Sequence, residues 1–139
     1  MSDRLREHET QKSRIPFCSL GLEAKKMHEI TELYKAIDRG CIQSISAHFT
    51  YDACYFRPGY RPLKSREEII AFYKRGRIIE RGEHKVCQLV GDHFEIAVWG
   101  EFNGVSKSGQ TLKEQFADFF EMRDGQVRNR RTFFARPAI

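Results

Sequence analysis

The sequence predicts an α+β protein, and three patterns support that class. In the first half of the chain, apolar residues recur at spacings of three and four, which is typical of amphipathic helices. In the second half, stretches of alternating apolar and polar residues are typical of β-strands. Short turn sequences separate these stretches, and Asp124-Gly125 is a strong β-hairpin signal. Helices followed by consecutive antiparallel strands favour a curved sheet that wraps around helices.

Size and composition indicate one folded domain with a charged surface. The chain has 139 residues, of which 40% are hydrophobic and 31% charged, a balance typical of a single globular domain. The formal net charge of +5 mildly favours anionic partners. Because the basic residues are scattered rather than clustered, we expect no nucleic-acid partner.

The beginning of the chain differs from the rest. Residues 1–15 carry mixed charges and almost no apolar side chains, which predicts a disordered tail ahead of a domain spanning residues 16–139. This segment lacks the apolar centre of a signal peptide, and no apolar run in the chain is long enough to cross a bilayer. We therefore expect a cytoplasmic protein that does not bind membranes.

The cysteines give no metal-binding pattern. Cys18, Cys41, Cys54 and Cys87 form no C-x-x-C pair and are not accompanied by suitably spaced histidines. We expect reduced thiols, as in the cytoplasm, and neither a metal ion nor another cofactor.

Two helices are expected before the first strand. Helical spacing of apolar residues covers Leu22–Asp38, and Arg39-Gly40 supplies a basic last turn and a glycine that ends the helix. Residues 42–49 continue the same spacing as a shorter second helix.

A strand and a third helix follow. Residues 50–57 alternate, which places Tyr51, with Ala53, Tyr55 and Arg57, on one face of the strand. The sequence Ser65–Glu68 is a capping box, in which Ser65 accepts a hydrogen bond from a first-turn amide and Glu68 reaches back to Ser65. A helix is expected to start there, with residues 69–73 supplying its apolar side.

The remaining residues are expected to form four antiparallel strands separated by short turns. Their alternation places the strands at Ile78–Leu89, His93–Phe102, Thr111–Met122 and Gln126–Phe134. The last two are joined by Asp124-Gly125 and are therefore expected to pair as a hairpin.

Two segments carry the motifs of a known family. The first is Phe-Thr-Tyr-Asp-Ala-Cys-Tyr-Phe-Arg-Pro-Gly-Tyr at residues 49–60, followed by Arg-Glu-Glu-Ile-Ile-Ala-Phe-Tyr at 66–73. The second is Phe-Ala-Asp-Phe-Phe-Glu at 116–121, followed by Asp-Gly-Gln-Val at 124–127 and Arg-Arg-Thr-Phe-Phe at 130–134. With the order of elements, they resemble the nuclear transport factor two-like superfamily, in its ketosteroid isomerase-like and SnoaL-like (polyketide cyclase) branch. The resemblance implies a cystatin-like fold, in which a cone-shaped, curved antiparallel sheet wraps around three helices from the N-terminal half.

The resemblance matches some of the family's catalytic positions and not others. Steroid isomerases of this family hold an oxyanion with a helix-one tyrosine and a protonated aspartic acid, and move a proton with a second aspartate. Counting from Gly40 and Asp52, the tyrosine position falls on Leu33, next to Tyr34, and the base position falls on Arg57. Asp118 matches the protonated acid, and Tyr73 matches a cavity tyrosine of the third helix. Arginine cannot act as a base at ordinary pH, so a steroid isomerase is not expected.

The same resemblance, extended by strand alternation, predicts the residues of a cavity. If Asp118 points inward, its neighbours two positions away do so too, and the last and first strands contribute inward residues of their own. Tyr34, beside the counted tyrosine position, joins the set. The predicted ligand-binding residues are Arg57, Tyr55, Tyr34, Phe116, Phe120, Phe134 and Thr132.

Asp118, Tyr73 and Arg130 are the predicted catalytic residues. Asp118 and Arg130 would lie on adjacent strands of the hairpin, so an ion pair is geometrically plausible. A guanidinium beside the carboxyl group favours the carboxylate, which would make Asp118 a base or an orienting group. The alternative is a buried ion pair that only fixes the hairpin.

Two arginines against one aspartate leave a surplus positive charge in this predicted cavity. We therefore expect a small-molecule ligand with an apolar body and a carboxylate, enolate or phenolate head. The protein would be a cofactor-independent isomerase or cyclase, or a related lyase or hydrolase. The alternative is a catalytically silent ligand-binding or dimerisation module of the same fold. Arg57, near the cavity mouth, could steer an anion or simply be solvated.

Two further residues are of interest. His84 titrates in the range useful for proton transfer, although a lone histidine in a strand is more often a surface or interface residue. If Val98, Gly100 and Phe102 face the cavity, Trp99 lies on the outer face of the sheet. A tryptophan there is typical of an interface, which predicts a homodimer through the outer sheet face.

Overall fold

A single five-stranded sheet dominates residues 29–137, the part of the chain that the computed structural model describes. The expected tail of residues 1–15 and the beginning of the first helix lie outside this range. The strand order is β1-β5-β4-β3-β2. The strands are β1 (Phe49–Phe56), β2 (Ile79–Gly91), β3 (Glu95–Ser106), β4 (Thr111–Arg123) and β5 (Gln126–Phe134).

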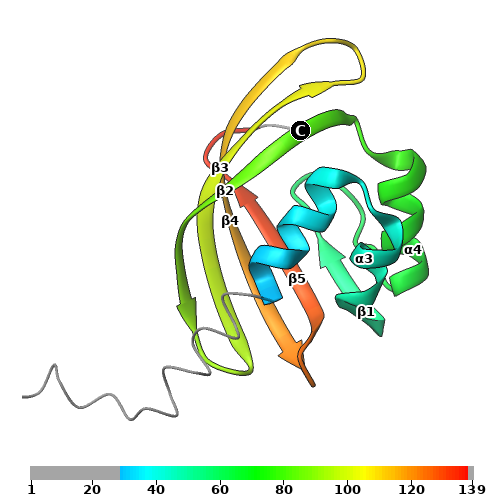
Figure 1. Ribbon diagram of the computed structural model, residues 1–139, viewed down its shortest axis with the longest axis vertical. Helices are drawn as coiled ribbons and strands as arrows, with labels where there is room; N and C mark the ends of the chain where they lie inside the picture. The colour runs from blue at the N-terminus through cyan, green and yellow to red at the C-terminus, as the bar shows by residue number, and fades with distance from the viewer. Residues whose placement is uncertain (1–28, 138–139) are drawn as a thin grey trace, which may run out of the picture.

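The helical elements pack against one face of this sheet, which bends around them (Figure 1). Residues 29–39 are helical, followed by α3 (Ile42–Ala47), then α4 (Arg66–Ala71), which continues as the π-helical turn η1 (Phe72–Gly76). The α+β class and the curved sheet around three helices are therefore confirmed. No helix of residues 29–137 is long and apolar enough to span a membrane.

Local sequence signals account for where α4 begins. The Ser65 hydroxyl accepts a hydrogen bond from the Glu68 amide at 3.1 Å, as the capping box predicts. The Glu68 carboxylate, however, accepts from the Lys64 amide at 2.7 Å rather than from Ser65. The cap holds α4 and, through it, the aromatic residues of η1 over the sheet.

The β4–β5 hairpin forms as predicted. Asp124 and Gly125 both have positive φ, 52° and 78°, the left-handed backbone that a two-residue hairpin turn requires. Asp118 lies opposite Thr132 across this pair, and Phe120 lies opposite Arg130. The side chains of Phe116, Asp118 and Phe120 are buried, whereas that of Phe119 is exposed, so the predicted alternation of β4 is confirmed.

The edge strand β1 departs from regular pairing. It runs parallel to β5, and its register with β5 shifts between Phe49 and Cys54. This irregularity breaks the alternation, so Tyr51 is exposed while Ala53 and Tyr55 are buried, and the expectation that all three share one face was wrong for Tyr51.

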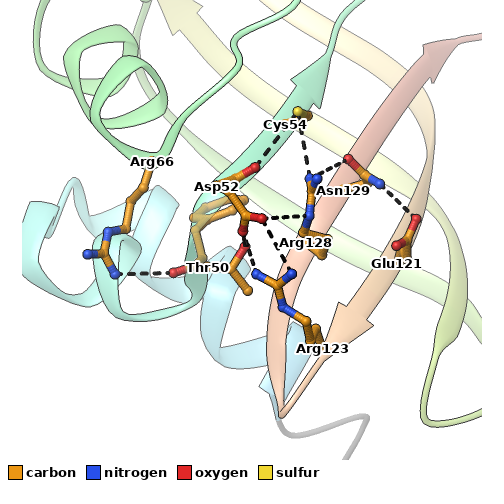
Figure 2. Close-up of polar contacts among 9 residues, drawn as sticks. Thr50, Asp52, Cys54, Arg66, Glu121, Arg123, Arg128 and Asn129 are labelled. Carbon is orange, nitrogen blue, oxygen red and sulfur yellow. Dashed lines mark hydrogen bonds and ion pairs between the residues drawn. The ribbon is translucent and has the colours of Figure 1, made fainter.

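A polar cluster ties β1 to the hairpin on the outside of the fold (Figure 2). The Asp52 carboxylate lies 2.5 Å from Arg123 Nη2 and 3.3 Å from Arg128 Nε. Asp52 and Arg123 are both half exposed, so water screens this ion pair. In the core beneath this edge, Phe49 and Val127 are buried opposite each other.

Candidate functional site

A cavity of about 110 Å³ opens between the sheet and η1. Its wall is mainly aromatic and aliphatic, with a few polar groups from β1, β2, β5 and η1, the composition expected of a small-molecule site. The lining residues are Ile37, Tyr55, Arg57, Tyr60, Phe72, Tyr73, Gly76, Arg77, Ile78, Ile79, His84, Phe102, Phe116, Arg130, Thr132 and Phe134.

Asp118 lies directly beneath this wall rather than in it. Its side chain is fully buried, and one carboxylate oxygen accepts hydrogen bonds from the Tyr34 hydroxyl at 2.6 Å and from Arg130 Nη2 at 2.9 Å. The other oxygen contacts the Thr132 hydroxyl. With three donors around it, the carboxylate is well placed to hold Arg130 and Thr132 in the cavity wall.

Arg130 carries the positive charge at the base of the cavity. Its Nη2 pairs with Asp118, as expected, and its Nη1 donates to the Tyr73 hydroxyl at 2.8 Å. Burial alone would lower the pKa of this guanidinium, but the Asp118 carboxylate together with the hydroxyl groups of Tyr55, Tyr73 and Tyr34 outweighs burial and raises the pKa well above its ordinary value. Arg130 is therefore charged throughout the physiological range. Its buried Nε has no hydrogen-bond partner among residues 29–137.

Arg57 lies against aromatic rings near the end of β1. Its guanidinium carbon is 4.0 Å from the centre of the Phe72 ring and 4.5 Å from that of Tyr60, distances at which cations interact with aromatic faces. Its Nε is buried, again without a hydrogen-bond partner in the described part of the chain. Of the two expectations for Arg57, anion steering and simple solvation, the second is therefore wrong.

His84 is the main site residue that sequence reasoning underestimated. The expectation of a surface or interface position is wrong, because the side chain lines the cavity and is only 10% exposed. Its Nδ1 lies 2.5 Å from Asp38 Oδ1. The signal that could have placed His84 in the cavity is its pairing with Phe102 of β3, because alternation already placed Phe102 inward.

The other predicted ligand-binding residues divide into two groups. Tyr55, Phe116, Phe134 and Thr132 line the cavity. Tyr34 and Phe120 are buried beneath the wall, with Tyr34 turned to Asp118. The tyrosine that contacts the carboxylate is thus Tyr34, one residue after the counted position, whereas Leu33 belongs to the core.

No three His, Cys, Asp or Glu side chains converge on a possible metal site within residues 29–137. The polar side chains that line the cavity are instead those of three arginines (Arg57, Arg77 and Arg130), one histidine, three tyrosines and one threonine.

A family model for the SnoaL-like domain matches residues 30–130. This range spans all the helices and strands of the described fold up to the middle of β5. No curated protein matches the sequence of this chain.

Solved structures of the same fold carry several different descriptions. A proposed SnoaL-like polyketide cyclase from a Jannaschia species superposes with a TM-score of 0.71 at 18% identity, covering 88% of this chain and 90% of its own. An epoxide hydrolase from M. tuberculosis gives 0.70 at 14% identity, covering 80% and 83%. A Catenulispora acidiphila protein with a ketosteroid isomerase-like fold, solved with trimethylamine, gives 0.69 at 14% identity, covering 76% and 83%. At these identities the likeness shows the fold alone.

Proposed function

The chain belongs to the SnoaL-like domain family, and we propose that its cavity binds a small ligand with an apolar body of about one ring and an anionic head. The volume of the cavity limits the apolar body of the ligand to about one ring. A protein cavity of roughly 150 Å³ holds a benzene molecule, and this cavity of about 110 Å³ opens to the surface, so a larger ligand would project from its mouth.

The guanidinium groups of the cavity wall are the observation that carries the proposal. Arg57, Arg77 and Arg130 line the cavity, and none of the described residues that line it is an aspartate or a glutamate. Only Arg130 of these three is paired with the carboxylate of Asp118 beneath the wall. The wall therefore carries an excess of positive charge, which the carboxylate, enolate or phenolate head of a ligand would balance.

The proposed chemistry is proton transfer of the isomerase or cyclase type, without a metal ion or organic cofactor. In an apolar cavity, a fixed guanidinium stabilises an oxyanion that develops during the reaction more strongly than water does. Arg130 and Tyr73 would face that oxyanion, and Asp118 would hold Arg130 in place. Reactions of this type that pass through an enolate or another oxyanion are favoured by an anion-stabilising site of this kind.

One observation favours the second candidate, a ligand-binding module without catalysis. Asp118, the carboxylate expected to move a proton, is enclosed by its three donors and does not line the cavity. If no other group transfers protons, the cavity would only bind its ligand.

Calorimetry with phenylacetate tests the proposed site. Phenylacetate carries one ring and one carboxylate, and phenylacetamide is its neutral counterpart. We expect phenylacetate to bind at least tenfold more tightly than the amide. Arg57→Met should weaken phenylacetate binding about tenfold, because a hydrogen bond to a charged group contributes roughly 1.5–3 kcal/mol.

The matched control is Arg61→Met, because Arg61 is exposed and lies outside the cavity wall. It should leave the affinity within about twofold. Equal affinity for the acid and the amide, or an unchanged affinity in Arg57→Met, would contradict an anion-binding cavity.

We also propose the cytoplasm as the compartment. Cys41, Cys54 and Cys87 are free thiols in the structure, which suits a reducing environment.

A further inference from the structure

His84 lines the cavity, yet the anion-binding role gives it no task. We propose that His84 is the general base of this cavity and that Asp38 is the residue that positions it. The inference rests on the proposed function, because it needs a ligand in the same cavity.

Asp38 holds His84 at two points. It lies in the last turn of the helical residues 29–39, and its Oδ1 is 2.5 Å from the Nδ1 of His84 on β2. Its Oδ2 accepts a hydrogen bond from the backbone amide of His84 at 2.9 Å. Since a carboxylate can only accept, Nδ1 carries the proton of the neutral ring and Nε2 carries the lone pair.

Nε2 is the atom available for chemistry. It makes no hydrogen bond to any of residues 29–137. Because it is also absent from the unpartnered atoms of these residues that are closed to solvent, it is accessible. With Nδ1 turned to Asp38 and the side chain lining the cavity, Nε2 is the ring nitrogen left to meet a ligand. An aspartate, a histidine and a free Nε2 make up the base half of a catalytic triad.

Three aromatic rings fix the orientation of the imidazole. Tyr34 stacks on it, with ring centres 4.9 Å apart, while Phe102 and Phe116 lie at 4.8 and 5.4 Å. A base must be held in a narrow range of orientations to contribute to catalysis. The rings and the Asp38 contacts together supply this restraint.

Burial keeps His84 neutral among the charged and titratable groups that surround it. Asp38 and Tyr34 face it from the helical residues, and Asp118 and Arg130 act from β4 and β5. Burial lowers the pKa of His84 below its ordinary value of 6.5, and the hydrogen bond that His84 donates to Asp38 only partly opposes this. The ring is therefore an unprotonated acceptor at neutral pH, as a base must be.

The proposed step is removal of a proton from a carbon next to a carbonyl group. His84 Nε2 forms the new N–H bond while the C–H bond breaks. The C–H electron pair forms a C=C bond, and the carbonyl π pair moves to oxygen. The resulting enolate lies in the cavity with Arg57 and Arg130, and the imidazolium is stabilised by Asp38. The imidazolium then returns the proton to the oxygen or to another carbon of the ligand.

Phenylpyruvate is the probe for this step, because it combines one ring, a carboxylate and an enolisable carbon. Its keto–enol conversion can be followed by ultraviolet absorbance, while phenylacetate binding reports on the cavity separately. We expect the protein to accelerate the conversion with a rate that rises with pH through an inflection below 6.5. His84→Gln should lower the rate at least 100-fold, far more than it weakens the binding of phenylacetate. His93→Gln, at an exposed histidine, is the control.

Asp38→Asn separates positioning from a merely structural role. Losing the carboxylate removes the interaction that raises the pKa of His84, so the inflection should move to lower pH and the rate should fall. An unmoved inflection would overturn the role of Asp38.

The remaining outcomes are also decisive. The role of His84 as a base would be wrong if the His84→Gln rate stayed within threefold of that of the unaltered protein. It would also be wrong if the unaltered protein bound phenylacetate but did not accelerate the conversion. In both cases the proposed binding site would be unaffected. Loss of phenylacetate binding in His84→Gln would make His84 a structural residue. Failure of the unaltered protein to bind phenylacetate would instead defeat the proposed function itself.

Discussion

At the scale of single residues, the Asp118–Arg130 pair decides how the cavity is charged. The exposed fractions of both side chains are close to zero, so neither charge is screened by water. The pair survives burial because Tyr34 and Thr132 satisfy the carboxylate and Tyr73 accepts from the guanidinium. Replacing one partner leaves the other as an uncompensated buried charge.

We therefore expect Asp118→Asn to lower the free energy of unfolding by about 3–5 kcal/mol. The double variant Asp118→Asn/Arg130→Met should recover part of this loss, because it no longer buries a lone guanidinium. Urea denaturation of the two single variants and the double variant gives the coupling energy. If Asp118→Asn lowered the free energy of unfolding by less than about 1 kcal/mol, the Asp118–Arg130 pair would not organise the base of the cavity.

At the scale of elements, short-range signals in the sequence were sufficient for most of the fold. The capping box at Ser65 and the turn at Asp124-Gly125 form from neighbouring residues alone, so both could be predicted. The alternation of β4 likewise needs only the pleat of one strand. The resemblance to a known family added the inward direction of Asp118.

What the sequence did not predict depends on contacts between distant segments. The register of β1 with β5 shifts between residues far apart in the sequence from their partners, so the exposure of Tyr51 has no local signal. Asp38 and His84 meet across 46 positions, and no short-range pattern links a helix end to a strand interior. Tyr34 contacts Asp118 from one residue beyond the counted position, an offset that counting without gaps cannot detect.

At the scale of the whole molecule, the outer face of the sheet carries an apolar stripe. Trp99, Phe119 and Phe133 are 44%, 52% and 50% exposed. They lie on three neighbouring strands around Ala117, which is opposite both Trp99 and Phe133. We propose that a second copy of the chain covers this stripe. A two-fold dimer places the same patch on both sides of its interface, which suits a patch of large flat side chains around a small one.

Sedimentation at micromolar concentration tests this dimer. We expect the unaltered protein to sediment as a dimer and Trp99→Lys to shift it toward monomer, since a buried lysine at the interface would lack a partner. Phe94→Lys is the matched control, because Phe94 is exposed outside the stripe. A monomeric unaltered protein, or a Trp99→Lys variant that remains dimeric, would exclude an interface centred on Trp99.

The most direct test of a cavity that receives an anion is the NMR signal of the guanidinium groups of Arg57 and Arg130, which line it. In protein labelled with ¹⁵N, the Nε–H resonances of Arg57 and Arg130 can be assigned with Arg→Lys variants and followed as phenylacetate is added. The proposed site predicts that at least one of these resonances shifts at saturation, because the carboxylate then lies against that guanidinium group, and that phenylacetamide shifts them far less. If phenylacetate saturates the protein and both resonances stay where they were, the ligand is held elsewhere and the account of this cavity is wrong.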